Sequence, residues 1–98
     1  MKVSLLIVLI NFPVRNFAQE KRFTFELKNV SVSAVYLHIE KNSDYSFVYN
    51  PQEIRKIGLK DYTFKDATIR EILEYCLKGS DLTYEIRDKH VIIRRDNE

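Results

Sequence analysis

Residues 68–79 read TIREILEYCLKG and give the clearest indication of the fold. Thr68 stands directly before an apolar stripe, and Glu71 follows three positions later, which is the spacing of a helix capping box. The stripe consists of five residues at helical spacing, namely Ile69, Ile72, Leu73, Cys76 and Leu77. Gly79 is a typical residue just after the end of a helix. These features predict a helix between Thr68 and Gly79 that faces a protein core.

Strands are predicted on both sides of this helix. Residues 82–86 alternate between apolar and polar side chains, which is typical of a half-buried strand. Asp88 and Lys89 are suited to the turn of a tight hairpin, so residues 90–94 are expected to form the return strand. Before the helix, residues 62–64 show the same alternation. The second half of the chain therefore reads as strand, helix and hairpin.

The first half has a similar order. Residues 23–28 alternate as a strand, and Ser31 is suited to cap a helix. Four apolar residues follow at helical spacing, namely Val32, Val35, Tyr36 and Ile39. Residues 45–49 read as a second strand, whose aromatic side chains favour packing in the core over the alternative of a binding patch. A proline at position 51 then begins a loop, in which residues 52–57 are expected to form one helical turn.

The two halves can be aligned with each other. Ser31 and Thr68 lie 37 positions apart, and at that offset Val32 meets Ile69. The run SDYSF at residues 43–47 then meets SDLTY at residues 80–84. Any two strand–helix–strand units of equal length would look partly alike, but the shared run favours an internal duplication.

Composition indicates one small globular domain. The chain has 98 residues, of which 45% are hydrophobic, and it contains only two glycines and two prolines. These values exclude collagen-like and disordered classes. The single cysteine, Cys76, has no partner for an internal disulfide bond. A large enzyme with its own cofactor domain does not fit this length.

Residues 1–18 have the order of a secretory signal peptide. A positive start at Lys2 precedes the apolar run at residues 3–10, and Ala18 is a small residue at the expected cut before Gln19. The apolar run is shorter than the roughly 20 residues of a membrane-spanning helix. The alternatives are a buried core strand and a start codon further upstream. We therefore expect a signal peptide at 1–18 and one domain at 19–98.

Removal of this leader changes the charge balance. The formal net charge is +2, and Lys2 and Arg15 both lie in the leader, so 14 of the 16 basic residues remain against 14 acidic ones. Binding to nucleic acid depends on clustered surplus cations. The neutral balance predicts that nucleic acid is not a partner.

Two longer stretches resemble a known family. They are FTFELKNVSVSAVYLHIEKNSDYSFVYN at residues 23–50 and FKDATIREILEYCLKGSDLTYEIRDKHVIIRR at residues 64–95. Both are similar to the short secretin-and-TonB N-terminal (STN) domain, in the form found at the front of SusC/RagA-type TonB-dependent outer-membrane receptors of Bacteroidetes. The resemblance rests on the combination of IEK at 39–41, YSF at 45–47, and LKG at 77–79 followed by a closing hairpin.

The resemblance implies a fold, a location and a partner. The fold would be α+β, with duplicated β-α-β units, two helices packed on small sheets and a C-terminal β-hairpin, as in the first periplasmic domain of secretins. The domain would lie in the periplasm at the outer membrane and contact the periplasmic domain of a FecR-type anti-sigma regulator. In full-length receptors it would precede the plug and barrel. Because the sequence ends at Glu98, we expect a receptor fragment, a split frame or a free-standing module; the alternative function is a secretin-type ring or docking domain.

No constellation of residues in the sequence indicates catalysis. His38 and His90 are the only histidines, and with Cys76 they lack the close spacings of a zinc site. Cys76 lies on the apolar stripe, which favours a buried, inert thiol over a catalytic or intermolecular one. Glu71 and Glu74 lie early in the predicted helix, where carboxylates stabilise the helix dipole. We therefore expect no enzyme activity, no metal, no cofactor and no small-molecule substrate.

A protein-binding surface is predicted from the remaining residues. Tyr75 falls off the apolar stripe, and an exposed aromatic residue among charges is a common interface anchor. The last strand could offer an edge to a partner strand, through Val91, Ile93 and Arg94, with Arg87 beside it. The alternative for the arginines is that their charge protects the edge from aggregation.

Overall fold

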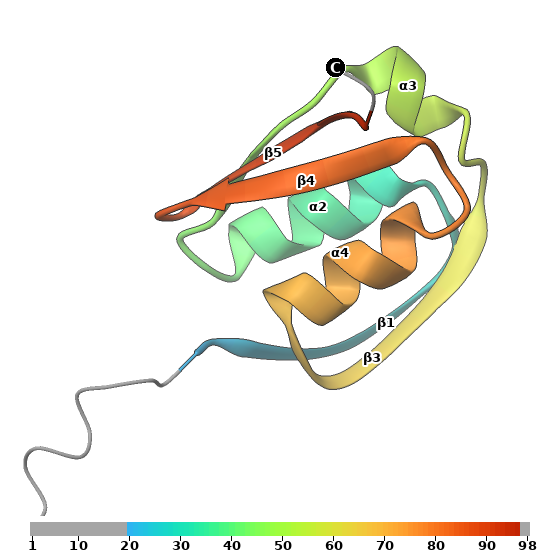
Figure 1. Cartoon of the computed structure of the whole chain (residues 1–98). Helices are drawn as coiled ribbons and strands as arrows, with labels where there is room; N and C mark the ends of the chain where they lie inside the picture. Colours follow the sequence, from blue (N-terminus) through green and yellow to red (C-terminus); the bar gives the residue numbers. More distant parts are fainter. Residues whose placement is uncertain (1–19, 97–98) are drawn as a thin grey trace, which may run out of the picture.

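The protein forms three layers in the computed structural model, which describes residues 20–96. Two helices lie side by side between a two-stranded and a three-stranded sheet (Figure 1). The predicted signal peptide and its cut between Ala18 and Gln19 lie outside the described residues. Within residues 20–96, no helix has the length and apolar character needed to cross a membrane.

The first unit contains β1 (Arg22–Val30), α2 (Val32–Lys41) and β2 (Ser46–Val48). Ser31 is the N-cap of α2, as predicted, but its side chain makes no capping hydrogen bond and instead bonds to the hydroxyl of Ser33 at 2.7 Å. The short helix α3 (Pro51–Arg55) follows, at the predicted helical turn. It begins because Asn50 accepts a hydrogen bond from the Gln52 N–H at 2.8 Å and proline fits the first helical turn.

The second unit contains β3 (Lys60–Thr68), α4 (Ile69–Leu77) and β4 (Leu82–Arg87), and the hairpin closes with β5 (His90–Arg95). The predicted capping box is present. The Thr68 hydroxyl accepts from the Glu71 N–H at 3.2 Å, and the Glu71 carboxylate accepts from the Thr68 N–H at 2.8 Å. Gly79 adopts a φ of +84°, a conformation that glycine takes without steric cost, so it ends the helix as predicted.

The strands of each unit belong to different sheets. β1 pairs with β3 in antiparallel orientation, while the second sheet has the order β2-β5-β4. β5 runs parallel to β2 and antiparallel to β4. The α+β prediction of two strand–helix–strand units with a terminal hairpin is confirmed. The prediction that β5 offers an open edge is wrong, because β5 is the central strand of its sheet.

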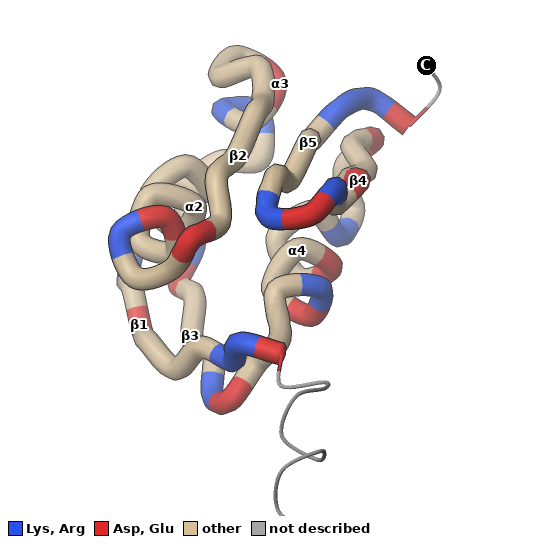
Figure 2. The backbone as a smooth tube through the Cα atoms, turned by 90° about the vertical axis from the view of Figure 1, so that its left-hand side faces the viewer, with Lys and Arg blue, Asp and Glu red and all other residues tan. Residues whose placement is uncertain are grey.

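The core lies between the helices and both sheets. The apolar stripe of α4 is buried as predicted, and Tyr62 from β3 and Val91 from β5 are fully buried against it. Tyr36 of α2 stacks on Phe47 of β2 with ring centroids 4.3 Å apart. Among residues 20–96 no charged residue is buried. Figure 2 shows basic and acidic residues interspersed among the elements.

Candidate functional site

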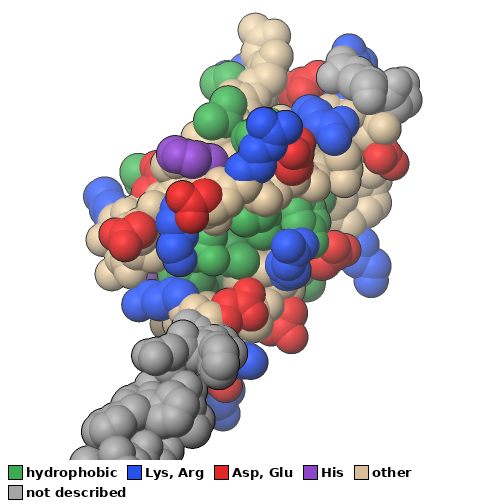
Figure 3. All heavy atoms as spheres, turned by 60° about the vertical axis from the view of Figure 1, so that its left-hand side comes forward, with side chains coloured by type: hydrophobic (Ala, Val, Ile, Leu, Met, Phe, Trp, Pro, Cys, Tyr) green, Lys and Arg blue, Asp and Glu red, His purple; other side chains and the backbone are tan. Residues whose placement is uncertain are grey.

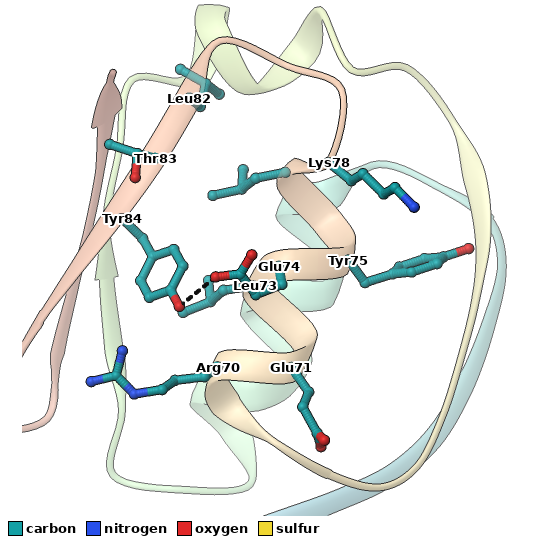
Figure 4. A pocket seen from close by; sticks show the side chains of 10 residues that line it. Arg70, Glu71, Leu73, Glu74, Tyr75, Lys78, Leu82, Thr83 and Tyr84 are labelled. Carbon is teal, nitrogen blue, oxygen red and sulfur yellow. Dashed lines mark hydrogen bonds between the residues drawn. The ribbon is translucent and has the colours of Figure 1, made fainter. Parts of the chain in front are cut away.

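Among the predicted interface residues, Tyr75 is the aromatic one, and the structure leaves it exposed. It lies on α4 and is 49% exposed. Its ring meets the rings of Tyr62 and Phe64 edge-on, with centroids 5.9 and 5.7 Å away. These contacts hold the side chain against β3, away from β4 (Figure 4). Tyr75 thus remains about half exposed while its ring packs against two aromatic residues of β3.

The predicted edge residues do not form a surface. Val91 and Ile93 are 0% and 6% exposed, because their side chains face the core. β5 is paired on both sides, with β2 along residues 90–92 and with β4 along its whole length. β5 is the last strand in sequence, but it is not an edge strand, because β2 of the first unit pairs with it in parallel. The sequence carries no local signal for this pairing.

The two predicted arginines are exposed and share one acidic partner. Arg87 Nε lies 2.7 Å from Glu85 Oε2, and a terminal nitrogen of Arg94 lies 4.0 Å from Glu85 Oε1. Exposed ion pairs of this kind contribute little to stability. These arginines lie on the hairpin, whereas Tyr75 lies on α4 beside β3, so the structure does not gather the predicted residues into one site.

A different feature stands out on the surface, namely an open groove between α4 and β4. Its volume is about 710 Å³. Leu73 and Leu77 of α4 and Leu82 of β4 line its apolar part, and Tyr84 forms a wall (Figure 4). Hydrophobic side chains also gather in the middle of the face in Figure 3, with charged side chains around them. Sequence reasoning missed this groove because it depends on how β4 is placed over α4.

Polar groups lie at one end of the groove. The Tyr84 hydroxyl donates a hydrogen bond to Glu74 Oε2 at 2.8 Å. Burial and this bond to Glu74 raise the pKa of Tyr84, while the nearby Arg70 opposes the rise. Arg70 thus lies near the same hydroxyl as Glu74, at the same end of the groove. The groove therefore combines an apolar lining with side chains of both charges, namely Arg70, Glu71, Glu74 and Lys78.

The cysteine and the two histidines considered as catalytic or metal-binding residues have structural roles instead. Cys76 is fully buried, and burial raises the pKa of its thiol to about 12, so the thiolate is scarce at neutral pH. The His38 ring packs on Phe25 with centroids 4.2 Å apart. His90 begins β5, and its Nδ1 lies 2.9 Å from the Ser46 hydroxyl. In residues 20–96 no three histidine, cysteine or acidic side chains converge as metal ligands would.

The protein is thus a small α+β domain with an open groove on its surface between α4 and β4. The sequence matches the family described as the secretin and TonB N terminus short domain, over residues 45–96. That match spans β2 to β5, which is more than half of the chain. The chain belongs to this family, as its sequence resemblance predicted. A search of the curated proteins finds no match.

Membership in this family establishes the general character of the domain. The family occurs at the N-terminus of secretins and TonB-dependent receptors, in the periplasmic regions of outer-membrane proteins. It is a family of non-catalytic domains. In residues 20–96 no charged side chain is buried, whereas the ionisable side chains of Cys76, Tyr36 and Tyr62 are.

Proposed function

We propose that this chain provides a periplasmic protein-interaction and signalling domain of a TonB-dependent outer-membrane receptor system. The receptor is of the SusC/RagA type, the domain precedes its plug and barrel, and a signal peptide at residues 1–18 directs export. The partner is the periplasmic domain of a FecR-type anti-sigma regulator. The observation that carries the proposal is the family match over residues 45–96.

The physical character of the domain supports a binding role. Its buried residues serve packing, and no charged side chain in the described part of the chain is withdrawn from water. Enzymes generally shift the pKa of catalytic groups by burial and close charges. Here the shifted groups are three tyrosines and one cysteine, each raised mainly by burial. The surface, with the α4–β4 groove and Tyr75, is what the domain offers to other molecules.

Binding to the regulator tests this proposal directly. The domain would be titrated with the periplasmic domain of a FecR-type regulator from the same genome, by isothermal calorimetry. We expect a one-to-one complex between a monomeric domain and the regulator. A matched control is Ile72→Asp, which unfolds the domain and should abolish binding. Assembly into rings without the regulator, measured by analytical ultracentrifugation, would instead support a secretin-type role.

A further inference from the structure

β2 lies at one edge of the β2-β5-β4 sheet, and its sequence is suited to pairing with a further strand. Residues 45–50 read YSFVYN, with three aromatic residues, one β-branched residue and no charged side chain. The side chain of Val48 in this segment is 58% exposed. Short uncharged segments of high β propensity at a sheet edge favour edge-to-edge association, and natural proteins protect them against it.

The backbone N–H of Phe47 points to the open side of β2. The Ser46 N–H donates to the Lys89 carbonyl at 3.0 Å, so the backbone groups of Ser46 are directed to β5. Successive residues of a strand direct these groups to opposite sides, and the N–H of Phe47 is therefore directed away from β5. Phe47 is the middle residue of the three-residue strand, so its N–H is the central donor of this edge.

Glu40 of α2 already binds this donor. Its carboxylate accepts a hydrogen bond from the Phe47 N–H at 2.9 Å. The loop between α2 and β2 is held in place by Ser43, whose hydroxyl donates to the Ile39 carbonyl at 2.6 Å and accepts from the Tyr45 N–H at 3.2 Å. A strand added to β2 would have to displace the carboxylate before it could bond to Phe47. Glu40 thus takes the place that a carbonyl of a further strand would have.

The second unit repeats the loop but not the carboxylate. At the offset of 37 positions, Ser43 corresponds to Ser80 and Glu40 corresponds to Leu77. The Ser80 hydroxyl donates to the Leu77 carbonyl at 2.7 Å and accepts from the Leu82 N–H at 3.1 Å, as Ser43 does in the first unit. The two loops therefore share their hydrogen bonds, and the loop geometry by itself does not require a carboxylate at position 40.

We propose that Glu40 closes the β2 edge and prevents the domain from pairing through this edge with a second copy of the chain. The carboxylate satisfies the central donor of the edge. A strand that covered Glu40 would also have to bury its charge, which is costly without a partner. The inference concerns the domain itself and does not depend on the regulator.

Sedimentation velocity at increasing protein concentration tests the proposal. We expect Glu40→Ala to shift from monomer toward dimer as the concentration is raised, while the unaltered domain stays monomeric. Glu74→Ala is the matched control, because it removes a helix carboxylate whose partner is the Tyr84 hydroxyl instead of an edge N–H. It should stay monomeric. A Glu40→Ala variant that is folded by circular dichroism and monomeric at every concentration would overturn the proposal.

A second substitution identifies the edge through which the variant associates. Val48→Lys places an exposed charge on β2, and edge lysines oppose strand addition. Glu40→Ala combined with Val48→Lys should therefore return to the monomer. Undiminished association of this double variant would mean that the contact lies elsewhere on the domain, and the role proposed for Glu40 would be wrong.

Amide hydrogen exchange provides a measurement on the unaltered domain, which does not require a variant to fold. We expect the Phe47 amide to exchange at least about tenfold more slowly than the same amide in an unstructured peptide, because it is bonded to Glu40. A Phe47 amide that exchanges at the unstructured rate would show that the β2 edge is open, and the proposal would then fail.

Discussion

The phenolic oxygen of Tyr84 lies 2.8 Å from a carboxylate oxygen of Glu74, and this hydrogen bond joins β4 to α4 across the groove. It connects two elements that are separated by a turn in sequence and by the groove in space. The bond therefore helps to set the width of the groove.

Tyr84→Phe should lower the free energy of unfolding by about 0.5 kcal/mol, because the bond is exposed and exchanges readily with water. Urea denaturation at pH 7 measures the change. Tyr75→Phe is the control, since the exposed Tyr75 hydroxyl donates no hydrogen bond to a residue in the described part of the chain. A larger loss for Tyr75→Phe than for Tyr84→Phe would contradict the role given to this bond.

The N-cap residues of α2 and α4 differ in their hydrogen bonds, so we expect their substitution to have different effects on stability. Thr68 caps α4 through its side chain, whereas the Ser31 hydroxyl bonds to Ser33 and leaves the first turn of α2 uncapped by it. Thr68→Ala should therefore cost about 1 kcal/mol of stability, and Ser31→Ala clearly less. Thermal melts of the two variants would compare them. Equal losses of stability in the two variants would show that the hydrogen bonds of the capping box do not stabilise α4 measurably.

The local elements of this fold were predictable because their signals are local. The capping box at Thr68, the stripe from Ile69 to Leu77 and the glycine at position 79 each act within a few residues. The burial of Cys76 followed from the same stripe, as did the exposure of Tyr75 beside it.

The strand order was not predictable, because pairing energies depend on partners far apart in sequence. Nothing around Val91 distinguishes a central strand from an edge strand in a terminal hairpin. The parallel partner that covers it, β2, comes from 44 residues earlier in the chain, where Ser46 pairs with His90. The α4–β4 groove was missed for the same reason, since its two walls are defined only once the sheet is assembled.

Substitution of Ile72 is a stringent test of how α4 packs in the core. It is 0% exposed and lies in the middle of the α4 stripe. Ile72→Asp should unfold the domain, because a buried, unpaired carboxylate costs several kcal/mol, which is comparable to the whole stability of a small domain. Arg70→Asp, on the exposed face of the same helix, is the control and should keep the fold. A cooperative melt of Ile72→Asp, followed by circular dichroism, would disprove the packing described for α4.

The hydroxyls of Tyr36 and Tyr62 are buried and have no hydrogen-bond partner among residues 20–96. A buried donor without a partner destabilises the fold by about 1–3 kcal/mol. Tyr36→Phe and Tyr62→Phe should therefore each raise the free energy of unfolding, by about 1 kcal/mol, in urea titrations. Tyr84→Phe, which removes a bonded hydroxyl, supplies the opposite sign as a control. A loss of stability in both variants would contradict the unpaired state of these two hydroxyls.

We expect the free energy of unfolding to fall at alkaline pH, because Cys76 and Tyr62 are buried in their protonated forms. Burial raises the pKa of the Cys76 thiol from 9.0 to about 12 and that of Tyr62 from 10.0 to about 12. The folded state holds both protons more tightly than the unfolded chain does. Stability is therefore complete below pH 9 and falls as the pH rises toward 12, by about 1.4 kcal/mol per pH unit for each group that ionises only on unfolding.

Urea denaturation between pH 7 and pH 11 measures this slope. Cys76→Ala should remove the part of the decline that begins near pH 9 and keep the part that begins near pH 10, because the buried hydroxyls of Tyr62 and Tyr36, whose pKa values are also raised by burial, remain. An unaltered domain whose stability stays constant through pH 11 would mean that the thiol and the phenol ionise as easily in the fold as in the unfolded chain. The close packing of α4 against β3 that buries both groups could not then be correct.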